Sequence, residues 1–381
     1  MKGYQNNLRG GRRSLAIGCA LGAFFLISLP SQAIILLRTG DPEANTTEPA
    51  GELDGSGWQF LGDWGNFFGT VIGPNHFVTA RHVGGAVGGI FKYHGESYQT
   101  TSFYEFGKVD LRVWEICGTF PEPFAPLYLS DDEEGKALVV FGRGSTRGEE
   151  VHMQTRHGSE LRGWRTGKSD HRWRWGENVV TKVYDYAELG ERFQPRELQY
   201  LVVDFDREGG FNEAHLSPGD SGGPVFIEKD GEWALAGINY ATDGFFNFIP
   251  EGKGFVPLLF DAGGFYIDWG QDIGWVYIRD REEDIASSFY STRISNYVPL
   301  IEAVLEGSME PKGREPWVVS ASRPKGFYLS EYEQELDEGN QEIRLPVSGQ
   351  TRFYRLLGCS DYEMTSIRVE GSFVVLHYRM K

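Results

Sequence analysis

Short apolar runs separated by Gly, Pro, Asn and Asp follow one another along the chain from about residue 58 to residue 305. They include FFGTVIG, HFVTA, VDLRVWEI, ALVVFG, YLVVDFD, GPVFIE and WALAGINYA. Short runs at even spacing, bounded by turn-forming residues, are typical of the strands of an antiparallel sandwich or barrel. Long amphipathic helices do not alternate with these runs, which disfavours a doubly wound α/β sheet. We therefore expect an all-β protein in this region.

One segment has helical periodicity. In SNYVPLIEAVLEG, residues 295 to 307, the apolar side chains at positions 297, 300, 301, 304 and 305 fall on one helical face. Pro299 suits the first turn of a helix, and Gly307 suits its end. The pattern predicts a helix that closes the β region.

Two regions depart from the even spacing of strands. Residues 308 to 340 are rich in Pro and charge and predict a linker, whereas alternating apolar positions over 341 to 381 predict a small β appendage. Residues 143 to 175 are basic and contain three tryptophans, at positions 164, 173 and 175. Basic residues interleaved with tryptophan are compatible with polyanion or glycan binding. In an otherwise acidic protein, an elaborated surface loop is the favoured interpretation.

The first 33 residues have the pattern of a signal peptide. The apolar run LAIGCALGAFFLISLP follows four basic residues and precedes Ser31-Gln32-Ala33, a cleavage site with small residues. The alternative is an uncleaved anchor, because the apolar IILL after Ala33 lengthens the run nearly to a membrane span. Both interpretations place the body of the protein outside the cytoplasm, secreted or periplasmic.

Composition narrows the classes of partner and cofactor. The 381 residues have room for two or three domains, at ~150 residues each. A formal net charge of −17 disfavours nucleic acid, and also an anionic membrane surface once the signal is removed. No cofactor or metal is expected, since His152 and His157 are not spaced as a helical ligand pair. Outside the signal segment, Cys117 and Cys359 leave one long-range disulfide open.

The stretch HLSPGDSGGPVF, residues 215 to 226, contains a candidate nucleophile, Ser221. It satisfies the G-x-S-x-G pattern of α/β-hydrolases, and GDSGGP also surrounds the nucleophile of chymotrypsin-like proteases. In an α/β-hydrolase the base follows the serine, but the only later histidine is His377, near the end of the appendage. The first interpretation is therefore disfavoured.

A histidine and an aspartate precede the serine in suitable surroundings. FGTVIGPNHFVTARHV ends in His82 after a strand, turn and strand, and GKVDLRVWEI places Asp110 on a strand. These motifs resemble the TAAHC and DIALL motifs of chymotrypsin-like serine proteases, and their order with Ser221 is that family's order. Other carboxylates are less suited by order or surroundings: Asp54, Asp63, Asp204 and Asp206.

The resemblance spans about residues 34 to 305, because VVFGRG, WALAGINYA and STRISNYVPLIEAVL also resemble segments of the family. It implies two six-stranded antiparallel barrels, at about 34 to 130 and 131 to 307, with a C-terminal helix. It further implies that His82 is the general base, that Asp110 orients it and that Ser221 attacks the substrate. The backbone N–H groups of Gly219 and Ser221 would form the oxyanion hole.

The same resemblance implies two further pairs of residues. His215 would form the floor of the primary specificity pocket and Phe289 its wall, which disfavours a basic substrate residue there. Cleavage after Ala33 would free Ile34, whose amino group would pair with Asp220 and order the oxyanion loop. We therefore expect a secreted serine endopeptidase acting on protein or peptide substrates. The alternative is a catalytically silent homologue that serves as a binding module.

Overall fold

The computed structural model describes residues 34–185, 198–270, 273–313, 316–323, 329–330, 334–359 and 362–381. The expected signal segment, residues 1 to 33, lies outside these residues. The described chain is mostly β, as the apolar pattern predicted. Within it, no helix is long and apolar enough to cross a membrane.

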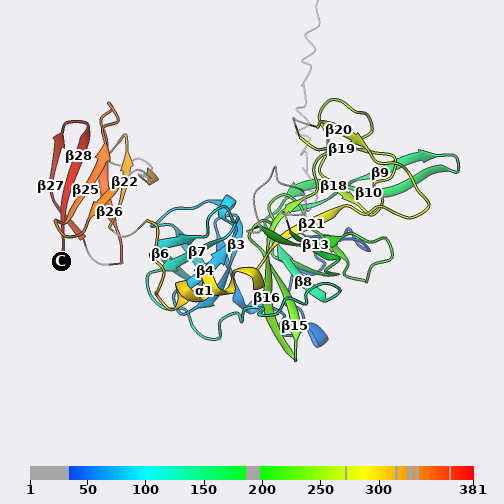
Figure 1. The fold of residues 1–381 in the computed structure, drawn as a ribbon, viewed down its shortest axis with the longest axis horizontal. Coiled ribbons are helices and arrows are strands. Elements are labelled where there is room, and N and C mark those ends of the chain that lie inside the picture. The colour runs from blue at the N-terminus through cyan, green and yellow to red at the C-terminus, as the bar shows by residue number, and fades with distance from the viewer. Residues whose placement is uncertain are drawn as a thin grey trace, which may run out of the picture. The chain divides into compact units, whose positions relative to one another are not determined.

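Six strands form a closed antiparallel barrel (Figure 1). In barrel order they are β2 (Leu61–Trp64), β3 (Phe67–Gly73), β4 (His76–Thr79), β7 (Arg112–Ile116), β6 (Glu96–Glu105) and β5 (Ile90–Tyr93). Aromatic side chains fill it: the rings of Phe77 and Phe91 stack with centroids 3.9 Å apart, and Trp114 is fully buried beside Phe77. The first of the two expected barrels is therefore observed.

The second half of the β region is a seven-stranded sheet. Its strands, in sheet order, are β11 (Arg174–Val179), β8 (Ala137–Gly142), β15 (Pro224–Lys229), β16 (Glu232–Thr242), β21 (Ser288–Arg293), β13 (Gln199–Asp204) and β12 (Lys182–Asp185). The edge strands β11 and β12 follow one another in the chain. Between them, the N–H of Val180 bonds Lys136 while that of Thr181 bonds Val202. The second closed barrel that was expected is therefore not observed. The chain changes partners at this point, so two short edge strands replace the single strand that a closed six-stranded barrel would contain.

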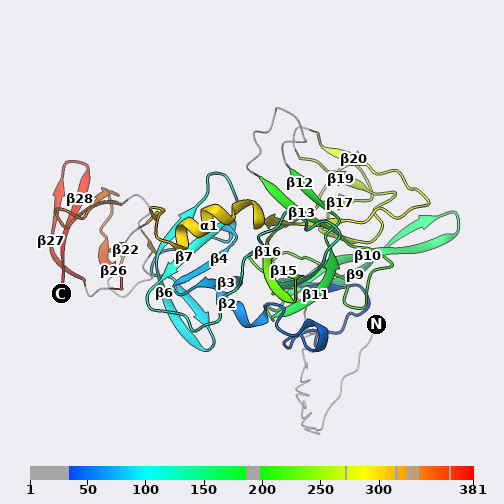
Figure 2. The same cartoon turned by 60° about the horizontal axis from the view of Figure 1, so that its bottom comes forward.

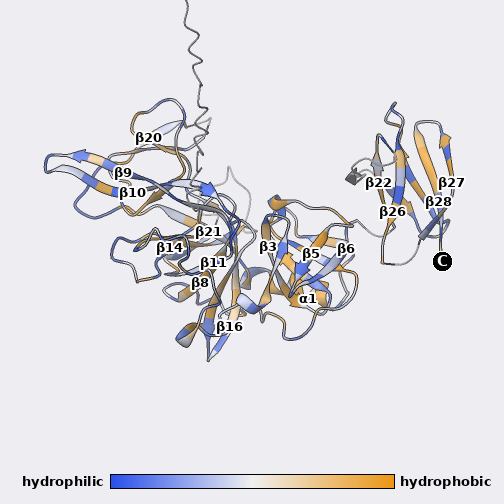
Figure 3. Cartoon of the chain, turned by 180° about the vertical axis from the view of Figure 1, so that it is seen from behind, coloured by the Kyte–Doolittle hydropathy of each residue, from blue (hydrophilic) through white to orange (hydrophobic). Residues whose placement is uncertain are grey.

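The predicted helix is observed as α1 (Val298–Leu305), preceded by a 3-10 turn over Ser295–Tyr297. Its buried side chains are Val298, Ile301 and Val304. They pack in a hydrophobic core to which the first barrel and the seven-stranded sheet both contribute. The helix lies beside the first barrel (Figure 2) and is coloured mainly as hydrophobic in Figure 3.

The basic segment expected as a surface loop is a long hairpin. It consists of β9 (Ser145–Thr155) and β10 (Gly158–Ser169), and β10 also pairs with β18 (Pro257–Leu259). Its tryptophan, Trp164, is 7% exposed and packs edge-on against Phe205 and Phe260. Trp173 likewise packs against Trp58 and Phe68. These two tryptophans therefore pack inside the protein, which agrees with the disfavoured status of a polyanion or glycan site.

The N-terminal segment packs with the second half of the β region rather than with the first barrel. β1 (Ile35–Leu36) pairs with β14 (Ala214–His215), directly before the loop of Ser221. A further sheet, β17 (Phe246–Asn247), β19 (Tyr266–Asp268) and β20 (Trp275–Tyr277), is inserted between β16 and β21. Both features place additional chain around the nucleophile loop.

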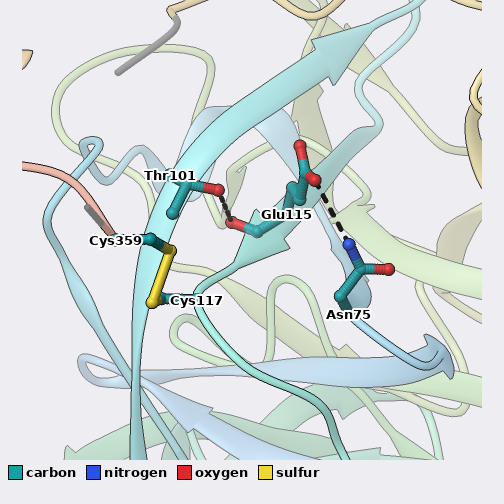
Figure 4. Close-up of a disulfide and its surroundings, with 5 residues drawn as sticks. All are labelled: Asn75, Thr101, Glu115, Cys117 and Cys359. Carbon is teal, nitrogen blue, oxygen red and sulfur yellow. Dashed lines mark hydrogen bonds between the residues drawn. A yellow bond between two sulfur atoms is a disulfide. The ribbon is translucent and has the colours of Figure 1, made fainter. Parts of the chain in front are cut away.

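The C-terminal region contains more strands than expected. One sheet consists of β23 (Leu329–Ser330), β22 (Trp317–Ala321) and β26 (Phe353–Leu357), and another of β24 (Glu335–Asp337), β25 (Glu342–Pro346), β28 (Phe373–Met380) and β27 (Tyr362–Glu370). Strands β22, β23 and β24 lie in the segment expected as a linker, where apolar WVVSA is flanked by Pro and charge. A disulfide joins Cys117 to Cys359, with their Cα atoms 5.3 Å apart (Figure 4). This is the long-range pairing that composition had left open.

Candidate active site

Ser221 lies in a tight loop between β14 and β15. Gly219 and Gly222 have φ values of 101° and 79°, a region that favours glycine. A Cβ on Gly219 would lie 2.8 Å from Gly144 Cα, and one on Gly222 would lie 2.4 Å from Thr79 Oγ1. Glycine is therefore required for the loop to approach the end of β4, the strand that leads to His82.

His82 is held by Asp110 through two hydrogen bonds. It lies in the 3-10 turn Arg81–Val83, directly after β4, and Asp110 lies shortly before β7, which pairs with β4. The His82 backbone N–H donates to Asp110 Oδ1 at 2.8 Å, and the ring Nδ1 lies 2.6 Å from Oδ2. A carboxylate only accepts, so Nδ1 carries the proton and Nε2 is left as an acceptor. This is the tautomer that a general base requires.

Tyr240 connects His82 to the surroundings of Ser221. Its ring lies edge-on to the imidazole with centroids 6.0 Å apart, and it lines the cavity that Ser221 also lines. Within the described residues, no hydrogen bond joins the Ser221 hydroxyl to His82. Such bonds are often long in a free enzyme and tighten when substrate binds. His82 and Asp110 of the first barrel are thus in direct contact, and Tyr240 connects them to the cavity beside Ser221.

The backbone around Ser221 leaves two N–H donors free. The N–H groups of Asp220, Gly222 and Gly223 donate to the carbonyls of Ser217, Asn239 and Asp220, respectively, at 3.0 to 3.1 Å. Those of Gly219 and Ser221 have no acceptor in the part of the chain that the structure describes. These are the two groups expected to bind an oxyanion.

Asp220 is fully buried and accepts several hydrogen bonds. The N–H groups of Gly144 and Ser217 donate to its two carboxylate oxygens, each at 2.7 Å, and the Ser217 hydroxyl lies 2.8 Å away. The backbone N–H of Ile34 also donates to it. Burial raises the pKa of Asp220 to about 6, while these hydrogen bonds act in the opposite direction. The structure thus brings together the two residues expected to form an activation pair.

Ile34 has an unfavourable backbone conformation in the intact chain. Its φ is 42°, a left-handed value that β-branched residues rarely adopt. At such a φ the carbonyl of the preceding residue crowds the side chain, so cleavage of the peptide bond before Ile34 would remove this crowding. A strain of about 1–3 kcal/mol is typical of such positions.

The structure places His215 and Phe289 together but away from the cavity beside Ser221. Both side chains are 0% exposed, and their ring centroids are 5.7 Å apart. His215 Nδ1 lies 2.7 Å from the Leu216 carbonyl, and burial lowers the pKa of the imidazole to about 4. The expected pocket floor is thus part of the hydrophobic interior, because the imidazole packs edge-on against the rings of Phe205 and Phe289.

The cavity beside Ser221 has a volume of about 170 Å³ and other walls. It is lined by Leu216, Ser217, Pro218, Ser221, Asn239, Tyr240, Ala241, Thr242 and Val256. None of these carries a carboxylate, an ammonium, a guanidinium or an imidazole. Asn239 was not predicted from the sequence; its amide donates to the carbonyls of Phe141 and Asp220 and holds the loop against β8. Its position in WALAGINYA, the strand next to β15, was the available signal.

The other aspartates and histidines considered from the sequence do not lie where they could act as the base or orient it. Asp63 forms an ion pair with Arg143, and Asp204 accepts a hydrogen bond from Ser288. His76 is buried beneath Tyr104, without a partner for its ring nitrogens among the described residues. Nowhere in the described ranges do three His, Cys, Asp or Glu side chains gather as a metal site would require.

Comparison with known proteins shows similarity to solved structures alone. No protein family model and no curated protein matches the chain. A double mutant of human heparin binding protein (CAP37) is 15% identical, with a TM-score of 0.38, and the match covers 67% of this chain and 95% of that protein. An atomic-resolution structure of HBP is also 15% identical, with a TM-score of 0.38, and the match covers 66% and 93%, respectively.

Proposed function

We propose that the chain is a secreted serine endopeptidase that cleaves peptide bonds through an acyl-enzyme. The observation that carries the proposal is the His82–Asp110 pair, in the tautomer of a general base, near a serine flanked by two free N–H groups. A hydroxyl becomes an effective nucleophile when such a base removes its proton.

In the first half of the reaction, Ser221 Oγ attacks the carbonyl carbon while His82 Nε2 takes the hydroxyl proton. The carbonyl oxygen becomes an oxyanion, to which the N–H groups of Gly219 and Ser221 donate. Asp110 stabilises the positive imidazole. The C–N bond then breaks, His82 gives its proton to the leaving amine, and the acyl group stays on Ser221.

In the second half, water replaces the amine. His82 takes a proton from water as the oxygen attacks the ester carbon, and the same two N–H groups bind the second oxyanion. The ester bond breaks, and His82 returns the proton to Ser221 Oγ. The carboxylic acid product leaves, and the enzyme is restored.

Reaction with a fluorophosphonate tests the proposal against its alternative, a silent binding module. An activated Ser221 would attack the phosphorus, displace fluoride and become covalently labelled, as mass spectrometry of the digested protein would show. Absence of labelling in protein that begins at Ile34 would favour the binding module.

Activation by signal removal extends the proposal. Cleavage after Ala33 would convert the Ile34 amide into an ammonium already placed at Asp220, and it would relieve the unfavourable φ of Ile34. A buried carboxylate gains much more from an ammonium than from a neutral N–H donor. The pair would hold the loop that carries Gly219 and Ser221.

Chains that begin at Met1 and at Ile34 should differ in thermal stability. In the longer chain the pKa of Asp220 rises on folding from 3.8 to about 6. Folding then favours the protonated acid, so the stability contributed by this group is present below about pH 4 and is lost as pH rises through about 6. The Ile34 ammonium would reverse this shift. We expect the shorter chain to have the higher melting temperature at pH 7, with a much smaller difference at pH 4.

Differential scanning calorimetry of both chains at the two pH values measures this effect. In the Asp220→Asn variants, which cannot ionise at this position, the pH dependence of the difference should disappear. Equal melting temperatures of the two wild-type chains at pH 7 would contradict the activation proposal.

The second prediction concerns the residue on the acyl side of the cleaved bond. The cavity beside Ser221 is similar in size to engineered cavities that hold benzene, and its lining offers no charged partner. Burying an unpaired charge there would cost several kcal/mol. We expect peptides with Leu or Met at this position to have kcat/KM values at least ~100-fold above those of matched Lys or Glu peptides. A preference for Lys or Glu in a peptide library would refute this assignment.

A further inference from the structure

A second cavity, of about 850 Å³, adjoins the one beside Ser221. The two share Tyr240 and Ala241 in their walls. The cavity lies on the face of the seven-stranded sheet that points away from the core. On β13, for example, Leu201 and Val203 are buried in the core, whereas the alternating residues Tyr200, Val202 and Asp204 line the cavity.

Five aromatic side chains line this cavity: Tyr184, Tyr200, Tyr240, Tyr290 and Trp269. Four come from strands of the sheet, and Trp269 comes from the inserted region after β19. Tyr200 and Tyr240 stack with centroids 5.0 Å apart. Lys182 Nζ lies 5.9 Å from the centre of the Tyr184 ring, so a cation already lies near one of these faces. Aromatic faces attract cations through the negative potential of the ring.

Carboxylates at the base of the cavity also favour a cation. Asp204 lines it and accepts a hydrogen bond from Ser288 Oγ at 2.6 Å. Asp243 lies behind the lining, where it accepts from the Tyr290 hydroxyl at 2.7 Å. In the described parts of the chain, neither carboxylate forms an ion pair with a basic side chain. Burial disfavours the charge of Asp243, on which Lys182 also acts electrostatically. Asp204 lines the cavity and accepts from a neutral hydroxyl, so its charge is available for a ligand.

Four exposed charged side chains complete the lining. Two are acidic, Glu283 and Asp284, and two are basic, Lys182 and Arg281. Asp284 is paired with Arg207. The lining thus has three acidic side chains, Asp204, Glu283 and Asp284, against two basic ones, and Asp204, held in β13, is less exposed than Lys182 and Arg281.

We propose that this cavity binds an arginine or lysine side chain of the substrate, located a few residues before the cleaved bond. The inference rests on the proposed function, because the cavity beside Ser221 would hold the residue whose carbonyl is attacked. An extended chain advances ~3.3 Å per residue, so the preceding residues can reach the second cavity past Tyr240. The preferred substrate therefore combines an uncharged residue at the cleaved bond with a basic residue upstream of it.

An aromatic or aliphatic substrate side chain would also find apolar contacts here. It would, however, cover Asp204 without supplying a counter-charge, which disfavours it relative to a cation. The distinguishing comparison is between arginine and citrulline, which have nearly the same shape and differ in charge.

Matched peptides test the proposal in the wild-type enzyme. Each has Leu before the cleaved bond and carries Arg, citrulline, norleucine or Glu at one of the three preceding positions. We expect Arg to exceed citrulline in kcat/KM by about tenfold at one position. Asp204→Asn should bring this ratio near one, whereas Asp230→Asn, the same charge change in the exposed turn after β15, should leave it unchanged. Trp269→Leu, at a side chain 56% exposed, should lower the ratio without affecting folding.

Calorimetric titration of the Ser221→Ala protein with the same peptides separates this inference from the proposed hydrolase. Tighter binding of the Arg peptide than of the citrulline peptide, lost in the Asp204→Asn background, supports the cation site. If the wild-type protein binds the Arg peptide more tightly than the citrulline peptide but cleaves none of the peptides, the cation site is supported and the hydrolase proposal is contradicted. Equal binding of the Arg and citrulline peptides, or a preference for norleucine or Glu, overturns the cation site.

Discussion

Replacing Ser221 by alanine is expected to lower kcat for peptide hydrolysis by about 10⁶-fold and to abolish fluorophosphonate labelling. The substitution removes the attacking oxygen, which has no hydrogen-bond partner among the described residues, so folding should be unaffected. His82→Ala should reduce kcat to a similar extent, because without a base the hydroxyl keeps its proton. Steady-state kinetics on a Leu-containing peptide, together with thermal melting curves, measures both effects.

Asp110→Asn provides a matched test of the orienting role. The amide can still meet the His82 ring, but it can present its NH₂ group, which favours the wrong tautomer of the imidazole. We expect a loss of about 10⁴-fold in kcat, smaller than that of Ser221→Ala. The double variant with Ser221→Ala should be no slower than Ser221→Ala alone, since the residues act as a unit. Near-normal turnover in any of the single variants would remove the triad assignment.

Asp220→Ala is expected to affect both stability and activity. It leaves the N–H groups of Gly144 and Ser217, and the nitrogen of Ile34, without their acceptor, and unsatisfied buried donors cost about 1–3 kcal/mol each. Removal of a carboxylate that burial disfavours offsets part of this cost. We expect a net loss of roughly 3 kcal/mol near pH 7 and a fall in kcat of about 10³-fold, because Gly219 and Ser221 lose their fixed backbone.

Denaturant unfolding and steady-state kinetics of the variant measure these losses. Asp230→Asn removes an exposed carboxylate from a turn where φ is 55°, a value that Asn also adopts, and should change stability by less than ~0.5 kcal/mol. A variant at Asp220 that unfolds like the wild type, with full activity, would show that the carboxylate does not hold the loop.

Local pattern was sufficient to predict much of the fold. The short apolar runs predicted strands, and the periodicity of residues 295 to 307 predicted α1. Both are local properties, since the pleat of a strand and the turn of a helix impose their period on neighbouring residues. The motifs around His82, Asp110 and Ser221 were recognisable for the same reason: each lies within a few residues of a strand end.

Pairing between distant segments was not predictable in this way. The division of one strand into β11 and β12 depends on where Val180 and Thr181 find partners, Lys136 and Val202. The hairpin β9–β10 was interpreted as a loop because its many charges mask the alternation of its two strands. Cys117 and Cys359 are 242 residues apart, and their contact exists only once the strands before them have paired.

By itself, the sequence determined that the chain is mostly β, ends its main β region with a helix and carries a serine, a histidine and an aspartate in a suggestive order. Only the tertiary structure decided that His215 is buried against Phe205 and Phe289, and that the cavity beside Ser221 is lined by the end of β16 and by Val256. The physical reason is that burial and cavity shape are sums over contacts from many segments. A position six residues before the nucleophile has no fixed environment until β1, β14 and the inserted region have packed around it.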